Sequence, residues 1–134
     1  MNTINVILEK TNTGYSAYST EITGAGTVGD TIEEVKNNYA EIIELTIDYF
    51  NEIGDVEKAQ QLQTANIKYH IDLNAFFEYY SLFNKSELAK YLGINPSHLR
   101  RLSMPNMELS NEKAEQIQMG LQRLSKEIQT FSFS

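Results

Sequence analysis

The segment from Lys85 to Leu102 constrains the fold more than any other part of the chain. Two short stretches with apolar residues at helical spacing flank Gly93, which can adopt the left-handed backbone that a tight corner between helices requires. A steep crossing of two helices also needs a small residue at the contact, and Ala89 supplies it. The apolar residues expected to face the inside of the corner are Leu88, Leu92, Ile94, Leu99 and Leu102. The segment therefore predicts a helix-turn-helix, with helices from Lys85 to Leu92 and from Pro96 to Leu102.

The second predicted helix carries the residues that we expect to contact DNA. The segment is similar to the helix-turn-helix of many bacterial repressors, in which the second helix lies in the major groove and its N-terminal residues meet base edges. Because Leu99 and Leu102 face inward, the two arginines beside them must point outward, and an arginine can bind guanine O6 and N7 in a bidentate way. Ser97 and the helix N-terminus suit a phosphate. The candidate DNA-binding residues are Asn95, Ser97, His98, Arg100 and Arg101. The alternative is an ordinary helical bundle in which Gly93 only ends a helix and the arginines are solvated.

Charge is distributed unevenly along the 134 residues, whose net charge is −7. Residues 1–64 contain three lysines and eleven acidic residues, a net charge of −8, whereas residues 65–134 contain eight basic and seven acidic residues, a net charge of +1. The first half would repel phosphates and attract a basic partner, and the second half is free to touch DNA. Because few cations flank the motif, useful affinity would require two copies on half-sites about one helical turn apart. We therefore expect a homodimer or a higher homo-oligomer.

The first 72 residues predict a small α+β unit. Residues 4–8, 15–22 and 27–28 are typical of three strands in a meander, because turn residues separate runs that favour strands. Thr31 and Glu34 fit a capping box, and an apolar stripe continues that helix as far as Ile53. Residues 55–65 indicate a loop or a short exposed helix, and 67–71 a fourth strand. The expected fold is a small antiparallel sheet with one long helix in residues 1–72, followed by an all-helical unit in 73–134 whose last helix begins at Ser110.

The N-terminal pattern resembles the HicB antitoxin family over roughly residues 4–53. An aromatic strand, Tyr15-Ser16-Ala17-Tyr18, leads through a Gly-containing loop to Gly29-Asp30-Thr31-Ile32-Glu33-Glu34. Thr23-Gly24-Ala25-Gly26 stands where that family commonly has a Pro-Gly-Cys-like loop. The resemblance implies a partial RNase H-like fold that blocks HicA, a small basic ribonuclease that cleaves mRNA, while the helix-turn-helix represses the shared operon. The −8 charge of the first half suits such a partner. The alternative is a stand-alone transcription regulator whose N-terminal half dimerises or senses a ligand.

The residue patterns do not indicate an enzyme. An active RNase H-like nuclease needs several carboxylates that converge on metal ions, and nothing forces Glu9, Glu21 and Asp72 into a cluster. The chain has no cysteine, which excludes disulfides and thiolate zinc sites, and it lacks a Gly-x-x-x-x-Gly-Lys phosphate loop. We therefore expect no catalytic residue, metal or cofactor. The sequence has neither a secretory signal nor a run of about 18 apolar residues, so we expect a cytoplasmic protein without a membrane helix.

Overall fold

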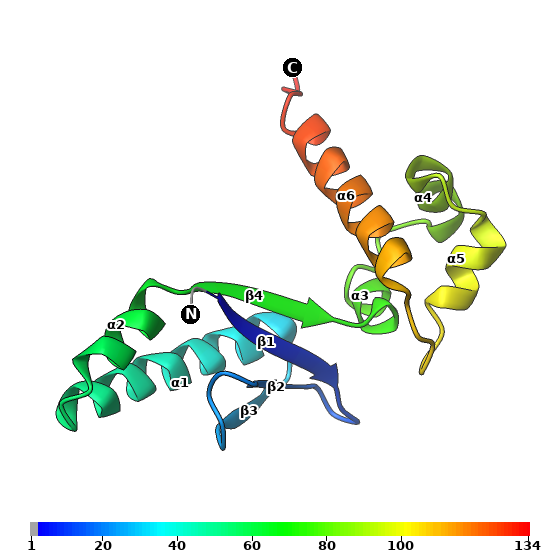
Figure 1. The fold of residues 1–134 in the computed structure, drawn as a ribbon. Coiled ribbons are helices and arrows are strands. Elements are labelled where there is room, and N and C mark those ends of the chain that lie inside the picture. The colour runs from blue at the N-terminus through cyan, green and yellow to red at the C-terminus, as the bar shows by residue number, and fades with distance from the viewer. Residues whose placement is uncertain (1–2) are drawn as a thin grey trace. The chain divides into compact units, whose positions relative to one another are not determined.

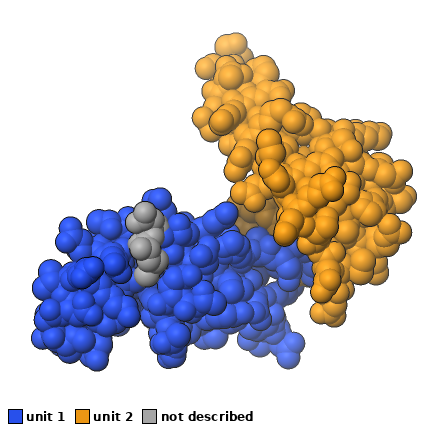
Figure 2. Space-filling view, in the orientation of Figure 1, with its two compact units in different colours: residues 1–75 blue, residues 76–134 orange. Residues whose placement is uncertain are grey.

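The computed structural model describes residues 3–134 and divides the chain into two compact units, Met1–Ala75 and Phe76–Ser134 (Figure 2). Met1 and Asn2, which belong to the N-terminus in which no secretory signal is expected, lie outside the described residues. The division expected from the sequence lies between residues 72 and 73.

The N-terminal unit contains a mixed four-stranded sheet with the order β3-β2-β1-β4 (Figure 1). β1 (Thr3–Lys10) pairs with β2 (Tyr15–Ser19) in antiparallel fashion, and β2 pairs in the same way with β3 (Gly26–Gly29). β4 (Asn66–Ile71) lies on the other side of β1 and runs parallel to it, with Ile4 opposite Ile67 and Leu8 opposite Ile71. The three-strand meander is therefore confirmed, and the fourth strand completes the sheet beside the first.

The predicted antiparallel sheet is wrong in one pair, because β1 and β4 are parallel. Parallel neighbours need a long crossover connection, which is usually helical. Here α1 (Ile32–Glu52) and α2 (Val56–Thr64) both lie between β3 and β4 in the chain, and they return it to the edge of the sheet in the direction of β1. The alternation of apolar residues along 67–71 indicates a strand, but it carries no information about the direction of that strand.

The long helix α1 forms the core of the N-terminal unit against one face of the sheet. The hydroxyl of Thr31 accepts a hydrogen bond from the backbone N–H of Glu34, as the capping box predicted. Val35 and Tyr39 are fully buried, and the Tyr39 hydroxyl donates to the Ser19 hydroxyl at 2.9 Å. A buried tyrosine is tolerated because its polar end is paired. The sheet contributes Ile4, Val6, Leu8 and Ala17 to this core.

Two element boundaries in the N-terminal unit differ from the sequence-based expectation. The second strand ends at Ser19 rather than residue 22, because the Ser19 hydroxyl accepts a hydrogen bond from the Ile22 N–H and closes a turn. Residues 56–64 form the helix α2, which buries Ala59 and Leu62 and is capped by the Asp55 carboxylate. Of the two alternatives left open for this segment, the short helix is therefore the one observed.

The C-terminal unit consists of helices. α3 (Leu73–Tyr79) follows Asp72, whose carboxylate accepts from the Ala75 N–H at 2.6 Å, and the division between the units falls inside this helix. α4 (Lys85–Leu92), α5 (Pro96–Leu102) and α6 (Asn111–Ile128) follow, with α6 capped by Ser110 as predicted. Among residues 3–134, no helix combines the length and the apolar character that crossing a membrane requires.

Candidate nucleic-acid interface

Gly93 forms the corner between α4 and α5. Its backbone is left-handed, with φ 75° and ψ 28°. The N–H of Ile94 donates to the carbonyl of Ala89 at 2.9 Å, and the N–H of Gly93 donates to the carbonyl of Lys90 at 3.2 Å. This pair of bonds is the Schellman arrangement that ends a helix at a glycine. The chain therefore leaves α4 in one fixed direction.

The inside of the corner is filled by the apolar residues that the sequence analysis assigned to it. Ala89 of α4 and Leu99 of α5 are fully buried. The two helices therefore meet where α4 has only the methyl group of Ala89. The other buried members are Leu88, Leu92, Ile94 and Leu102. The solvent-facing residues of α5 are thereby fixed, because its inner positions are occupied by Leu99 and Leu102.

The last helix holds the end of α4 through contacts that the sequence analysis missed. The side-chain amide of Gln116 donates to the carbonyls of Leu92 and Gly93, at 3.1 and 3.3 Å. Arg123 donates to the carbonyl of Tyr91 at 3.1 Å and stacks over the Tyr91 ring. These are carbonyls that a helix end leaves without intrahelical partners. α6 thus stabilises the corner between α4 and α5. Gly120, a glycine inside an otherwise helical pattern, was the sequence signal that α6 packs closely against another element.

Asn95 is the N-cap of α5. Its side-chain oxygen accepts from the backbone N–H groups of Ser97 and His98, at 2.9 and 3.4 Å. In this structure the side chain of Asn95 therefore occupies two of the N–H groups at the start of α5, where the sequence analysis places a phosphate. Pro96 at the first position of the helix has no N–H to offer.

The outer side of α5 carries the remaining candidate residues in two separate hydrogen-bonded groups. The guanidinium of Arg100 donates to the hydroxyl of Ser86 on α4 at 3.0 Å and to the hydroxyl of Ser97 at 3.3 Å. The guanidinium of Arg101 lies 2.8 Å from Nδ1 of His98. Both arginines are exposed, and hydroxyl partners orient a guanidinium group without cancelling its charge. Ser86 is a member of this group that the sequence analysis did not identify.

Such an arrangement can recognise an acceptor-rich surface. Each guanidinium presents several donors in a fixed plane, which matches the paired acceptors of guanine or of a phosphate. Exposed hydrogen bonds to hydroxyl groups exchange readily for bonds to a ligand, because both states satisfy the same donors. The structure therefore brings together Ser97, His98, Arg100 and Arg101 on one side of a short helix, with Asn95 at its start.

The N-terminal unit presents a different surface on α1. Six acidic side chains of this helix are exposed: Glu33, Glu34, Glu41, Glu44, Asp48 and Glu52. Leu45 and Tyr49 are also exposed beside them. Large apolar side chains within a charged face are a common composition of protein-binding surfaces.

The three carboxylates considered for metal-dependent chemistry have separate hydrogen-bond partners. Glu9 accepts from the Tyr18 hydroxyl at 2.9 Å, and this bond raises the pKa of Tyr18. Glu21 accepts from the Asn5 backbone N–H at 2.7 Å, which lowers the pKa of Glu21. Asp72 caps α3. In the part of the chain that the structure describes, no three His, Asp or Glu side chains are grouped so that they could hold a metal ion.

Comparisons with protein families, with curated proteins and with solved structures found no significant match.

Proposed function

We propose that this chain is a HicB-like antitoxin that represses its own operon. Its C-terminal unit binds operator DNA as a helix-turn-helix, and its acidic N-terminal unit, a partial RNase H-like fold, binds and blocks a basic mRNA-cleaving toxin similar to HicA. The observation that carries the proposal is the outer side of α5, where Arg100 and Arg101 are exposed on a helix that the Gly93 corner fixes. Neither half of this function requires a cofactor or catalysis by the chain.

Three features support DNA binding by α5. The corner has the glycine geometry and the small residue that two steeply crossed helices need. α6 holds the end of α4 through Gln116 and Arg123, which makes the corner rigid. The arginines lie within one turn of each other, so a single α5 can contact both a base edge and a neighbouring phosphate.

DNA binding is tested with the full chain and a duplex covering the region upstream of its own gene. Arg100→Ala removes one bidentate donor from each copy, and we expect the dissociation constant to rise about 10- to 100-fold. Lys126→Ala, which removes the same charge from the exposed end of α6, is the matched control and should change it little. An equal loss of DNA affinity in both variants would indicate that binding is only non-specific charge attraction. Unchanged binding by Arg100→Ala with an intact fold would contradict the proposal.

The exposed face of α1 supports binding of a basic protein. Its six carboxylates attract a cationic partner over a distance of about a Debye length, and the exposed Leu45 and Tyr49 can be buried on contact. The same charge disfavours nucleic acid as the ligand of this unit. A basic ribonuclease is a partner of this charge, and the resemblance to HicB implies one.

Toxin binding is tested by co-purification with the product of a neighbouring gene that encodes a small basic protein. Glu41→Lys combined with Glu44→Lys should abolish co-purification and the protection of mRNA from cleavage. Glu108→Lys combined with Glu115→Lys gives the same charge change on exposed positions of the C-terminal unit and should leave both intact. A chain that binds operator DNA but blocks no such protein would be the stand-alone regulator instead.

A further inference from the structure

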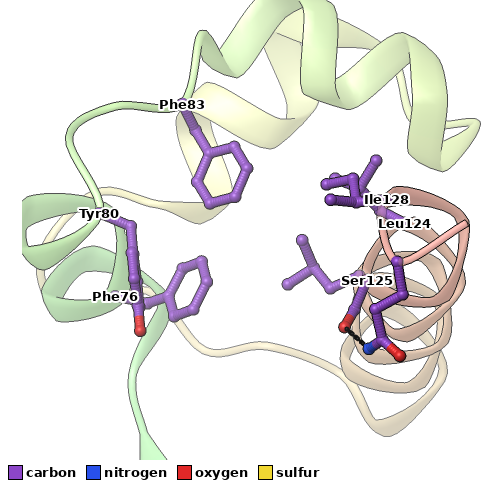
Figure 3. Close-up of a pocket in the computed structure, with 8 residues that line it drawn as sticks. Phe76, Tyr80, Phe83, Leu124, Ser125 and Ile128 are labelled. Atoms are coloured by element: carbon purple, nitrogen blue, oxygen red, sulfur yellow. Dashed lines mark hydrogen bonds between the residues drawn. The ribbon is translucent and has the colours of Figure 1, made fainter. Parts of the chain in front are cut away.

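The C-terminal unit has an apolar groove between α3 and the second half of α6 (Figure 3). One wall consists of the aromatic rings of Phe76, Tyr80 and Phe83, and the facing wall consists of Leu121, Leu124 and Ile128. The groove encloses a volume of about 490 Å³, and its polar edge is formed by Ser125 and Gln129. Its chemistry fits an apolar side chain rather than a charged group.

The two halves of α6 differ in what covers their apolar stripe. In the first half, Ile117 and Gly120 are buried, and Gly120 packs against Leu92 of α4. In the second half, Leu121 and Leu124 are only partly buried and Ile128 is 60% exposed. The stripe is continuous in sequence, and the described residues cover its second half only in part.

The residues directly after this helix supply side chains of the kind that the groove fits. Phe131 is 65% exposed and Phe133 is fully exposed, only two and four residues beyond Gln129 at the edge of the groove. A single copy therefore presents both an apolar hollow and projecting aromatic side chains on the same end of α6. Two copies related by a twofold axis can satisfy both features at once, because such an interface uses the same surface of each copy.

The exposed area approaches that of the smallest specific interfaces. Tyr80, Ile128, Phe131 and Phe133 expose on the order of 500 Å² per copy, if each large side chain offers roughly 200 Å². Two copies would therefore bury roughly 1,000 Å² from these residues alone, before the partly exposed groove walls are counted, close to the lower limit of about 1,200 Å² for specific interfaces.

We propose that a second copy of this chain covers the groove, with Phe131 and Phe133 of each copy inserted between the aromatic and aliphatic walls of the other. The inference rests on the proposed function only for its consequence, which is that two α5 helices are presented to paired half-sites. Self-association itself is measured without DNA. A dimer that binds no operator DNA would support this interface and contradict the proposed function. A monomer that binds operator DNA would contradict this interface and support the proposed DNA binding.

The first experiment measures the mass of the full chain in solution by sedimentation equilibrium, up to about 100 µM because interfaces of this size can be weak. We expect a mass near twice the 15.3 kDa of one chain. Phe131→Ser combined with Phe133→Ser should raise the dissociation constant by about 30-fold or more, as loss of central apolar anchors does. Both residues are exposed, so this variant should fold normally. Ile128→Lys should have a similar effect from the groove side.

A matched control distinguishes this interface from non-specific association of exposed apolar side chains. Met107→Ser combined with Met119→Ser also replaces two exposed apolar side chains of the C-terminal unit, and neither residue lines the groove. This variant should dimerise like the original chain. A monomeric original chain, or a dimer that survives both the tail and the Ile128 variants, would overturn the proposal.

A cross-linking experiment identifies the occupant of the groove. The chain contains no cysteine, so Ser125→Cys at the edge of the groove and Ser132→Cys in the tail introduce the only thiols, and both changes leave the apolar side chains in place. The two singly substituted chains, made with tags of different length, are mixed and oxidised, and we expect a disulfide that joins the Ser125→Cys chain to the Ser132→Cys chain. In the doubly substituted chain, a disulfide within one copy would mean that the groove is closed by its own tail, which would contradict the dimer.

Discussion

Gly120 of α6 lies directly against the side chain of Leu92 at the end of α4. A Cβ atom built on Gly120 would overlap Cδ2 of Leu92, which is itself buried. The absence of a side chain at position 120 therefore sets how closely the two helices approach. This approach also brings Gln116 and Arg123 within hydrogen-bond distance of the carbonyls at the end of α4.

Substitution of Gly120 should destabilise the C-terminal unit although glycine is a poor helix former. Gly120→Ala gains about 1 kcal/mol in helix propensity, but displacement of the buried Leu92 costs roughly 1–3 kcal/mol. We expect a small net loss for alanine and a larger one for Gly120→Val, measured by urea denaturation. Combining Gly120→Ala with Leu92→Ala should cost less than the two changes separately, because each relieves the other. Strictly additive changes in the free energy of unfolding would contradict a direct contact between Gly120 and Leu92.

The corner could be predicted from the sequence because its determinants are local. Gly93 and Ala89 are only a few residues from the positions that they constrain, and the spacing of leucines indicates the buried side of each helix. The same reasoning could not identify Gln116 or Arg123, because their partners lie 24 and 32 residues away in the chain. The sequence analysis assigned Asn95 to DNA and did not identify its local role as the N-cap of α5, because both roles suit an exposed position at the start of a helix.

Enlargement of Ala89 should disrupt the corner. Ala89 is fully buried where α4 meets α5, so Ala89→Leu must displace packed side chains at a cost of roughly 1–3 kcal/mol. Ala40→Leu places the same side chain on the exposed face of α1 and should change the free energy of unfolding by less than about 0.5 kcal/mol. Thermal unfolding monitored by circular dichroism measures both. A fully stable Ala89→Leu variant that still binds operator DNA would show that the turn is placed wrongly.

The hydrogen bond between Glu21 and Asn5 predicts a pH dependence of stability in the N-terminal unit. The Asn5 N–H lowers the pKa of Glu21 in the folded chain, so the ionised carboxylate stabilises the fold above the unfolded pKa of about 4.3 and ceases to do so as pH falls through the lower folded value. Glu21→Gln should therefore lower the melting temperature at pH 7, and the difference from the original chain should shrink below about pH 4. Glu44→Gln on the exposed face of α1 is the control. A difference that is constant from pH 7 to pH 3 would contradict the assignment.

The direction of β4 could not be predicted from the residue pattern of the N-terminal unit. The alternation of apolar residues along this strand indicates which side chains face the core, and Tyr69 and Ile71 do pack against it. Pairing with β1 in parallel depends instead on the length and path of α1 and α2, which are global properties of the chain. A few neighbouring residues determine whether a segment forms a strand, whereas the path of the whole unit determines the order and direction of the strands.

Asn95 allows the stability of α5 to be separated from the proposed contact with DNA. Asn95→Ala removes the oxygen that caps the Ser97 and His98 N–H groups and should cost about 1 kcal/mol of stability. Asn95→Asp keeps that oxygen, so stability should be retained, but it places a negative charge at the start of the helix that we propose lies in the major groove. Operator affinity should then fall for Asn95→Asp despite its normal unfolding curve, because a carboxylate near phosphates is repelled. Titrations at two salt concentrations check this reason, since the deficit should diminish as salt screens the repulsion. An Asn95→Asp chain with unchanged affinity at low salt would place this end of α5 away from DNA.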